Sequence, residues 1–428
     1  MTLKEMLGQK LVFGFHGTTL SPEFKALIQE YKIGNVILFL RNVSSAEQLR
    51  QLCGEIRALI LEETGCPPFI IIDQEGGMVS RLPADAVNVP GAMALAALGD
   101  PEGARLASEI TIRQLKGLGA NFNMAPVLDV NSNARNPVIG VRSFGDNPAR
   151  VADFGRAATA PYTGSGVLCC AKHFPGHGDT AVDSHLGLPR VDKAEAELEA
   201  LELIPFRRAI EAGVPAVMMS HVLFPQLEPN QLPCTMSRKM VTGLLREKVA
   251  AIQAGVDLAE ISSTFALEQA AAKALLEAGQ AGKLDLAEIQ ASVDRILRYK
   301  QQLFQAIDPA LCNQAQDRAA AETLSRRAVT EIGGSRFTVN ENTFFCGCAD
   351  YRASGAGNET GSGSTFPEYL AARFQAGSLV TPKDPTAQDI QVAVEAAKGS
   401  KAIVLGTCNA HLFRGQLALC SALAALGK

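Results

Sequence analysis

Short apolar runs alternate with longer amphipathic segments from residue 11 to about residue 305. The runs have the length and composition of β-strands, and the segments between them repeat apolar residues at helical spacing. This alternation is typical of parallel βα units. The pattern predicts seven strands: Leu11–Phe15, Asn35–Leu40, Pro68–Asp73, Ala120–Val130, Val167–Phe174, Pro215–Val222 and Val256–Ile261.

The starts of the intervening helices are marked by capping residues. Ser21-Pro22, Asp100-Pro101 and Asn147-Pro148 each place a capping side chain before a proline suited to the first helical turn. Ser45 and Gln48 have the spacing of a capping box. Six of the strands are nearly continuous apolar runs, as expected when helices cover both faces of a parallel sheet. We therefore predict an α/β fold of the (β/α)8 TIM-type barrel class.

The number of strands falls one short of the eight that close such a barrel. A helix that begins after Ser237 runs through Lys248-Val249 into Ala254 without an intervening strand. We expect one βα unit to be missing at this point.

Helices predicted at 266–277 and 285–304 complete the barrel, and a helix at 319–329 follows a linker. From about residue 337 the pattern changes to short strands at Phe337–Val339, Thr343–Cys348 and Ala402–Gly406, followed by a last helix at 415–426. These elements predict a truncated α/β sandwich. The expected organisation is a barrel at 1–308, a linker and helix at 309–336, and a partial sandwich domain at 337–428.

Composition narrows the possible partners. The chain of 428 residues has 40 basic and 44 acidic side chains and a net charge of −4, which predicts no binding to nucleic acid. No apolar run reaches the roughly 20 residues of a membrane span, and the first residues do not resemble a secretory signal, so we expect a cytoplasmic protein. The ten cysteines are scattered, so we predict free thiols, no metal and no cofactor.

The densest polar segment runs from Lys172 to His185 and follows the fifth predicted strand. In a barrel of this class, the loops after the strands form the active site. Asp183 and His185 are close enough for a carboxylate to orient an imidazole, which suits general acid–base catalysis. His173 and His177 have a spacing found in metal-dependent hydrolases, but Pro175 and its neighbours interrupt the helix that such a pair requires.

Two other segments follow predicted strands. The segment Asp73-Gln74-Glu75-Gly76-Gly77 combines carboxylates, which can bind adjacent hydroxyls, with glycines that allow a sharp turn, although Asp73 could simply cap the loop. Arg142, within Asn136–Gly145, could place a permanent cation in the site, or it could form an ordinary surface ion pair.

Together, three segments resemble the motifs of glycoside hydrolase family 3: Asp73–Gly77 with Arg81, Arg142–Gly145, and Lys172–Gly178 with Asp183-Ser184-His185. The last element resembles the bacterial β-N-acetylglucosaminidase (β-N-acetylhexosaminidase) branch. The resemblance implies that His185 is the general acid/base and that Asp183 orients it. It implies that the hydroxyls of the terminal sugar are held by Asp73, Arg81, Arg142, Lys172 and His173, while His177 braces the loop.

The activity that this resemblance implies is retaining hydrolysis of terminal β-linked N-acetylglucosamine from cell-wall muropeptides or chitin-type oligosaccharides, as in peptidoglycan recycling. The partner is then a small carbohydrate. The nucleophilic aspartate of the family's seventh strand has no counterpart here, and Asp257 and Glu260 correspond to the eighth strand instead. A sugar-binding pseudoenzyme is therefore an alternative, and phosphate could replace water as the acceptor.

Overall fold

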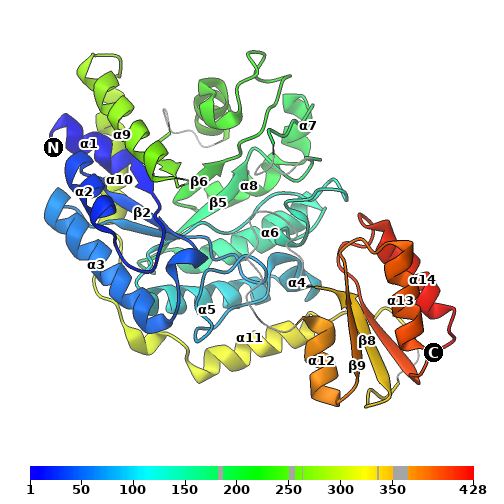
Figure 1. The fold of residues 1–428 in the computed structure, drawn as a ribbon. Coiled ribbons are helices and arrows are strands. Elements are labelled where there is room, and N and C mark those ends of the chain that lie inside the picture. The colour runs from blue at the N-terminus through cyan, green and yellow to red at the C-terminus, as the bar shows by residue number, and fades with distance from the viewer. Residues whose placement is uncertain (182–186, 250–255, 263, 335–336, 350–364) are drawn as a thin grey trace. The chain divides into compact units, whose positions relative to one another are not determined.

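The computed structural model describes residues 1–181, 187–249, 256–262, 264–334, 337–349 and 365–428. The chain divides into two compact units, Met1–Thr330 and Glu331–Lys428 (Figure 1). Within the described residues, no helix is long and apolar enough to cross a membrane.

The first unit contains a parallel sheet of seven strands in the order β6-β5-β4-β3-β2-β1-β7. Over the described residues the predicted number of strands is confirmed, although the strands are shorter than predicted and the fourth is reduced to two residues. Their bounds are β1 Leu11–Phe13, β2 Asn35–Leu38, β3 Phe69–Ile72, β4 Phe122–Asn123, β5 Leu168–Phe174, β6 Ala216–Met219 and β7 Ala259–Ile261.

Alternate residues of these strands point to two different apolar clusters. Val12, Ile37 and Ile71 belong to one buried cluster, together with Leu168 and Cys170. Their neighbours Phe13, Leu38 and Ile72 pack into another cluster with residues of α2, α3 and α5. Both faces of the sheet are therefore covered, which explains why the strands lack polar alternation.

The helices of this unit start largely as predicted. Ser21, Ser45 and Asn147 accept hydrogen bonds from backbone N–H groups of their helices. The prediction for Pro101 is wrong by one position: the helix begins at Glu102, and Asp100 accepts from the Glu102 N–H. The bounds are α1 Leu3–Lys10, α2 Pro22–Tyr31, α3 Ala46–Thr64, α4 Ala92–Ala97, α5 Glu102–Leu118, α6 Pro148–Thr159, α7 Glu195–Ala200, α8 Leu203–Glu211, α9 Phe265–Gln280, α10 Leu286–Lys300 and α11 Ala315–Arg327.

The sheet is open between β6 and β7. These strands end the strand order, and over the described residues they form no ladder with each other. The described chain between them contains a short 3₁₀ turn, Cys234–Met236, and a π-helix, Lys239–Val249, but no strand. The opening thus falls where the sequence predicted a missing unit, although Ala254 itself lies outside the described residues.

The second unit is a small parallel sheet of order β10-β8-β9, with β8 at Thr343–Cys348, β9 at Gly377–Thr381 and β10 at Ala402–Gly406. Phe345 stacks on Phe374 of α12 (Phe366–Phe374), whereas α13 (Ala387–Ala397) and α14 (Arg414–Ala424) share a buried cluster with Phe344 and Cys346. Helices thus cover both faces (Figure 1). The strand predicted at Phe337–Val339 is wrong, because these residues have no regular structure, and β9 was not predicted.

Candidate active site

Polar side chains continue the inner face of the sheet at the carboxyl ends of its strands. Asp73 follows Phe69 and Ile71 at alternate positions, and Lys172 follows Leu168 and Cys170 in the same way. Because β3 and β5 flank β4 and run parallel, their inward side chains meet at one edge.

The turn after β3 is shaped by its two glycines. Gly76 has a φ of 91°, and a Cβ atom there would lie 2.8 Å from the Pro90 carbonyl oxygen. Only glycine fits this combination of backbone angle and close packing. The Gln74 Oε1 atom accepts from the Arg81 N–H at 2.9 Å, so the same turn fixes the backbone of Arg81, whose side chain is buried.

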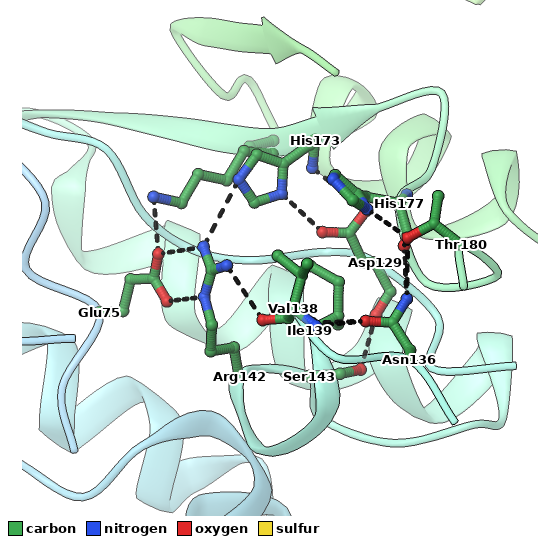
Figure 2. A network of polar contacts seen from close by, with 12 residues as sticks. Glu75, Asp129, Asn136, Val138, Ile139, Arg142, Ser143, His173, His177 and Thr180 are labelled. Carbon is green, nitrogen blue, oxygen red and sulfur yellow. Dashed lines mark hydrogen bonds and ion pairs between the residues drawn. The ribbon is translucent and has the colours of Figure 1, made fainter. Parts of the chain in front are cut away.

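An ion-pair cluster of Asp73, Glu75, Arg142 and Lys172 lies at this edge. Lys172 Nζ is 2.7 Å from both Asp73 Oδ1 and Glu75 Oε1. Arg142 donates from Nε and Nη2 to the two oxygens of Glu75 at 2.9 and 2.8 Å (Figure 2). Arg142 is buried, so the reading of it as a surface ion pair is wrong.

The cluster keeps its four groups charged despite burial. Burial opposes ionisation of Glu75, but Arg142 and Lys172 outweigh it and hold its pKa well below the ordinary range. Burial likewise opposes ionisation of Asp73, and Lys172 with Arg81 lowers its pKa. For Lys172 the two carboxylates overcome burial and raise its pKa. Two anions and two cations therefore stay balanced at neutral pH.

His173 connects this cluster to Asp129. Its Nδ1 lies 2.7 Å from Asp129 Oδ2, and its Nε2 lies 3.5 Å from Arg142 Nη2 (Figure 2). Burial, opposed by Asp129, lowers the pKa of His173 to about 4, so the imidazole is neutral at pH 7.

The loop after β5 is anchored by buried contacts. His177 is 2% exposed, and its Nδ1 lies 2.8 Å from Thr180 Oγ1. Asn136 donates to the His177 carbonyl oxygen at 2.8 Å. A Cβ atom at Gly178 would lie 1.8 Å from the Val130 carbonyl oxygen, so only glycine lets the loop approach the segment after β4 this closely. These contacts fix the start of the segment that leads to Asp183 and His185, which themselves lie outside the described residues.

The two later carboxylates differ in their surroundings. Asp257 accepts hydrogen bonds from Arg246, Arg295 and Ser292, so it is committed to structural contacts. Glu260 lies on β7 opposite Val12. Leu258, two positions earlier, packs against the buried apolar cluster that contains Val12 and Ile71. Although the residue is exposed to solvent, partial desolvation of its carboxyl and the nearby charge of Asp73 raise the pKa of Glu260 to about 7.

The structure brings together Asp73, Arg142, Lys172 and His173, and the charge of Arg81 acts on Asp73. Two further members, Glu75 and Asp129, lie at strand ends in the sequence prediction but were given no individual role there. Their position could have identified them, because a carboxylate just after an apolar strand of a parallel barrel lies at the rim where the active site forms. Among the described residues, no group of three or more His, Cys, Asp or Glu side chains could hold a metal ion.

Comparison with known proteins identifies relatives. The model of the glycosyl hydrolase family 3 N-terminal domain matches residues 2–250. Beta-hexosaminidase A of Pseudoalteromonas piscicida is 36% identical over 359 residues, which are 74% of this chain and 59% of that protein. A beta-hexosaminidase of Alkalilimnicola ehrlichii is 36% identical over 299 residues, 68% of this chain and 81% of that protein. The chain thus spans less than two thirds of the first relative's length.

Solved structures give the same relationship. A family 3 beta-N-acetylglucosaminidase from Paenibacillus sp. is 35% identical, with a TM-score of 0.89 over 99% of this chain and 88% of that chain. NagZ from Neisseria gonorrhoeae in complex with N-trifluoroacetyl-D-glucosamine is 27% identical, with a TM-score of 0.58 over 75% of this chain and 98% of that chain. Sequence and fold therefore agree that the chain belongs to glycosyl hydrolase family 3.

Proposed function

We propose that the site binds a terminal β-linked N-acetylglucosamine and is that of a retaining β-N-acetylhexosaminidase acting on muropeptides or chitin-type oligosaccharides. The observation that carries the proposal is the ion-pair cluster beside His173. Carboxylates and cations held at fixed spacing can bind the adjacent hydroxyls of one sugar ring. The names of the relatives, beta-hexosaminidase and beta-N-acetylglucosaminidase, support this substrate class.

In this proposal Asp73, Arg81, Arg142, Lys172 and His173 hold the sugar. Asp73 is the more exposed carboxylate of the cluster, with 18% of its side chain accessible against 7% for Glu75, so it is the better placed to contact a ligand. Glu75 then orients Arg142 and Lys172 from behind. His185 protonates the leaving oxygen, and Asp183 orients His185.

Retention also requires a carboxylate that attacks the anomeric carbon. Asp73 and Glu75 are neutralised by their ion pairs, and Asp129 is fully buried against His173. The described residues between β6 and β7 contribute no strand to carry another carboxylate. This observation favours a second candidate function for the chain as it stands: binding of the sugar without cleavage.

Release of nitrophenol from 4-nitrophenyl N-acetyl-β-glucosaminide tests both candidates. We expect turnover near background for this chain and an increase on the order of 10³-fold or more when a βα unit ending in Ser-Asp is inserted between Lys248 and Val249. His185→Ala in the restored chain should abolish the gain, whereas His411→Ala, in the second unit, serves as the matched control.

Calorimetric titration with N-acetylglucosamine separates the outcomes. Sugar binding without turnover in the unmodified chain would support the binding function, and binding with turnover after insertion would support the hydrolase. A restored chain that neither binds nor cleaves would contradict the proposal. Turnover by the unmodified chain would show that another carboxylate acts as nucleophile, and Glu260→Gln would then be the first variant to measure.

A further inference from the structure

Asp129 lies directly behind His173 and is completely buried. Its Oδ1 atom accepts two backbone N–H groups, from His177 at 2.7 Å and from His173 at 3.3 Å. Its Oδ2 atom faces His173 Nδ1 at 2.7 Å. Its carbonyl oxygen accepts from Ser143 Oγ at 2.6 Å, so side chain and backbone are both fixed (Figure 2).

These contacts determine the tautomer of His173. An ionised carboxylate only accepts hydrogen bonds, so the proton of the neutral imidazole must lie on Nδ1. Burial opposes ionisation of Asp129, but His173 and the His177 N–H outweigh it and lower the pKa of Asp129, which keeps it an acceptor. The Nε2 atom then carries a lone pair and faces the ion-pair cluster through Arg142.

We propose that Asp129 is a positioning residue that holds His173 with Nδ1 protonated, so that Nε2 accepts a hydrogen bond from a sugar hydroxyl. The proposal rests on the sugar-binding function proposed above. A purely structural role for Asp129 would be compatible with either tautomer of His173. The proposed role requires the proton to lie on Nδ1. Asp129 would act on the ligand only through His173.

Asp129→Asn is the sharpest variant, because the geometry predicts which way the amide points. Its oxygen must stay at the position of Oδ1, where two backbone N–H groups need an acceptor. Its NH₂ group then faces His173 Nδ1 and can only donate. The His173 proton is expected to move to Nε2, which leaves that atom a donor beside Arg142, itself a donor.

Nitrogen-15 NMR of histidine-labelled full-length chain reads the tautomer, with the His173 signal assigned by its loss in His173→Gln. We expect the Nδ1-protonated form in the unmodified chain and the Nε2-protonated form in Asp129→Asn. Calorimetry should show N-acetylglucosamine binding weakened roughly tenfold, with the circular dichroism spectrum retained. Asp179→Asn makes the same chemical change on the same loop, where the side chain faces Lys193, and should alter neither result.

An Nε2-protonated His173 in the unmodified chain would overturn the proposal, even if Asp129→Asn failed to fold. An inverted tautomer with sugar affinity unchanged would also overturn it. Failure of the unmodified chain to bind N-acetylglucosamine would instead reject the proposed function. The tautomer spectra would still show whether Asp129 orients His173.

Discussion

Strands β1 to β5 and strands β6 and β7 belong to one sheet but differ in burial. All residues of β1 to β4 are buried, as are all but one of β5. Every residue of β6 is partly exposed, and β7 has two exposed residues out of three. We call β1 to β5 the complete side of the sheet, and β6 and β7 the open side. The ion-pair cluster rests on the complete side, on β3, β5 and the loop after β4. In the function proposed above, sugar binding would therefore depend on the complete side, and the open side is where the described residues supply no strand to carry a nucleophile.

The largest effect that distinguishes the two sides is expected from removing the charge of Lys172, which lies on the complete side. Lys172→Met removes the cation between the largely buried carboxylates of Asp73 and Glu75, which should lower the free energy of unfolding by about 3–5 kcal/mol. Urea unfolding followed by circular dichroism measures the loss, and N-acetylglucosamine binding should disappear with it.

Lys25→Met, at an exposed position of α2, is the matched control and should stay within about 0.5 kcal/mol of the unmodified chain. A loss at Lys172 no larger than at Lys25 would mean that the complete side does not depend on its ion pairs.

A second test uses Lys300, which is buried beside residues that lie just before β1 and β2. Its Nζ donates to Gln9 Oε1 and to the Gly34 carbonyl oxygen, and burial lowers its pKa to about 7. The unfolded chain, with a lysine pKa near 10.4, therefore binds more protons above pH 7, so stability should rise with pH.

Between pH 7 and pH 9 we expect Lys300 to contribute an increase of about 2 kcal/mol to the free energy of unfolding. Urea unfolding at both pH values should show this increase in the unmodified chain and lose it in Lys300→Met. Equal changes in the two proteins would show instead that Lys300 stays charged in the folded protein up to pH 9.

The smallest effect is expected on the open side. Asp257 joins Arg246 of the π-helix to Arg295 of α10, and those cations outweigh burial to lower its pKa. Its side chain is 26% exposed, so Asp257→Asn should cost only about 1 kcal/mol at pH 7. Because its folded pKa is depressed, this contribution should vanish as the pH falls below about 4.

Thermal unfolding at pH 7 and at low pH checks this prediction. Asp294→Asn, at an exposed position of α10, is the control. A loss as large as that in Lys172→Met would erase the distinction between the two sides.

The sequence predicted the positions of strands β1 to β5 because they lie in apolar runs that are buried on both faces. It failed where that signal was absent. Strand β9, Gly377–Thr381, has two exposed residues and begins with glycine, whereas Phe337 attracted a strand prediction and is 58% exposed without regular structure. Apolar character alone does not report which short segments pair in a small sheet.

The site shows the same division. Arg142 and Lys172 were recognised from their motifs, but their shared partner Glu75 is 67 positions from Arg142 in the chain. Asp129 and His173 are similarly separated by 44 positions. Such pairings depend on which strand ends become neighbours, and only the assembled sheet determines that.

The balance of charge in the ion-pair cluster has a consequence for measurements in solution. An uncharged sugar that enters a site with two anions and two cations, already paired and buried, neither gains nor loses net charge there. Its affinity should therefore be nearly the same in dilute buffer and in concentrated sodium chloride, because dissolved ions screen buried pairs little. The recognition site should tolerate wide variation in ionic strength.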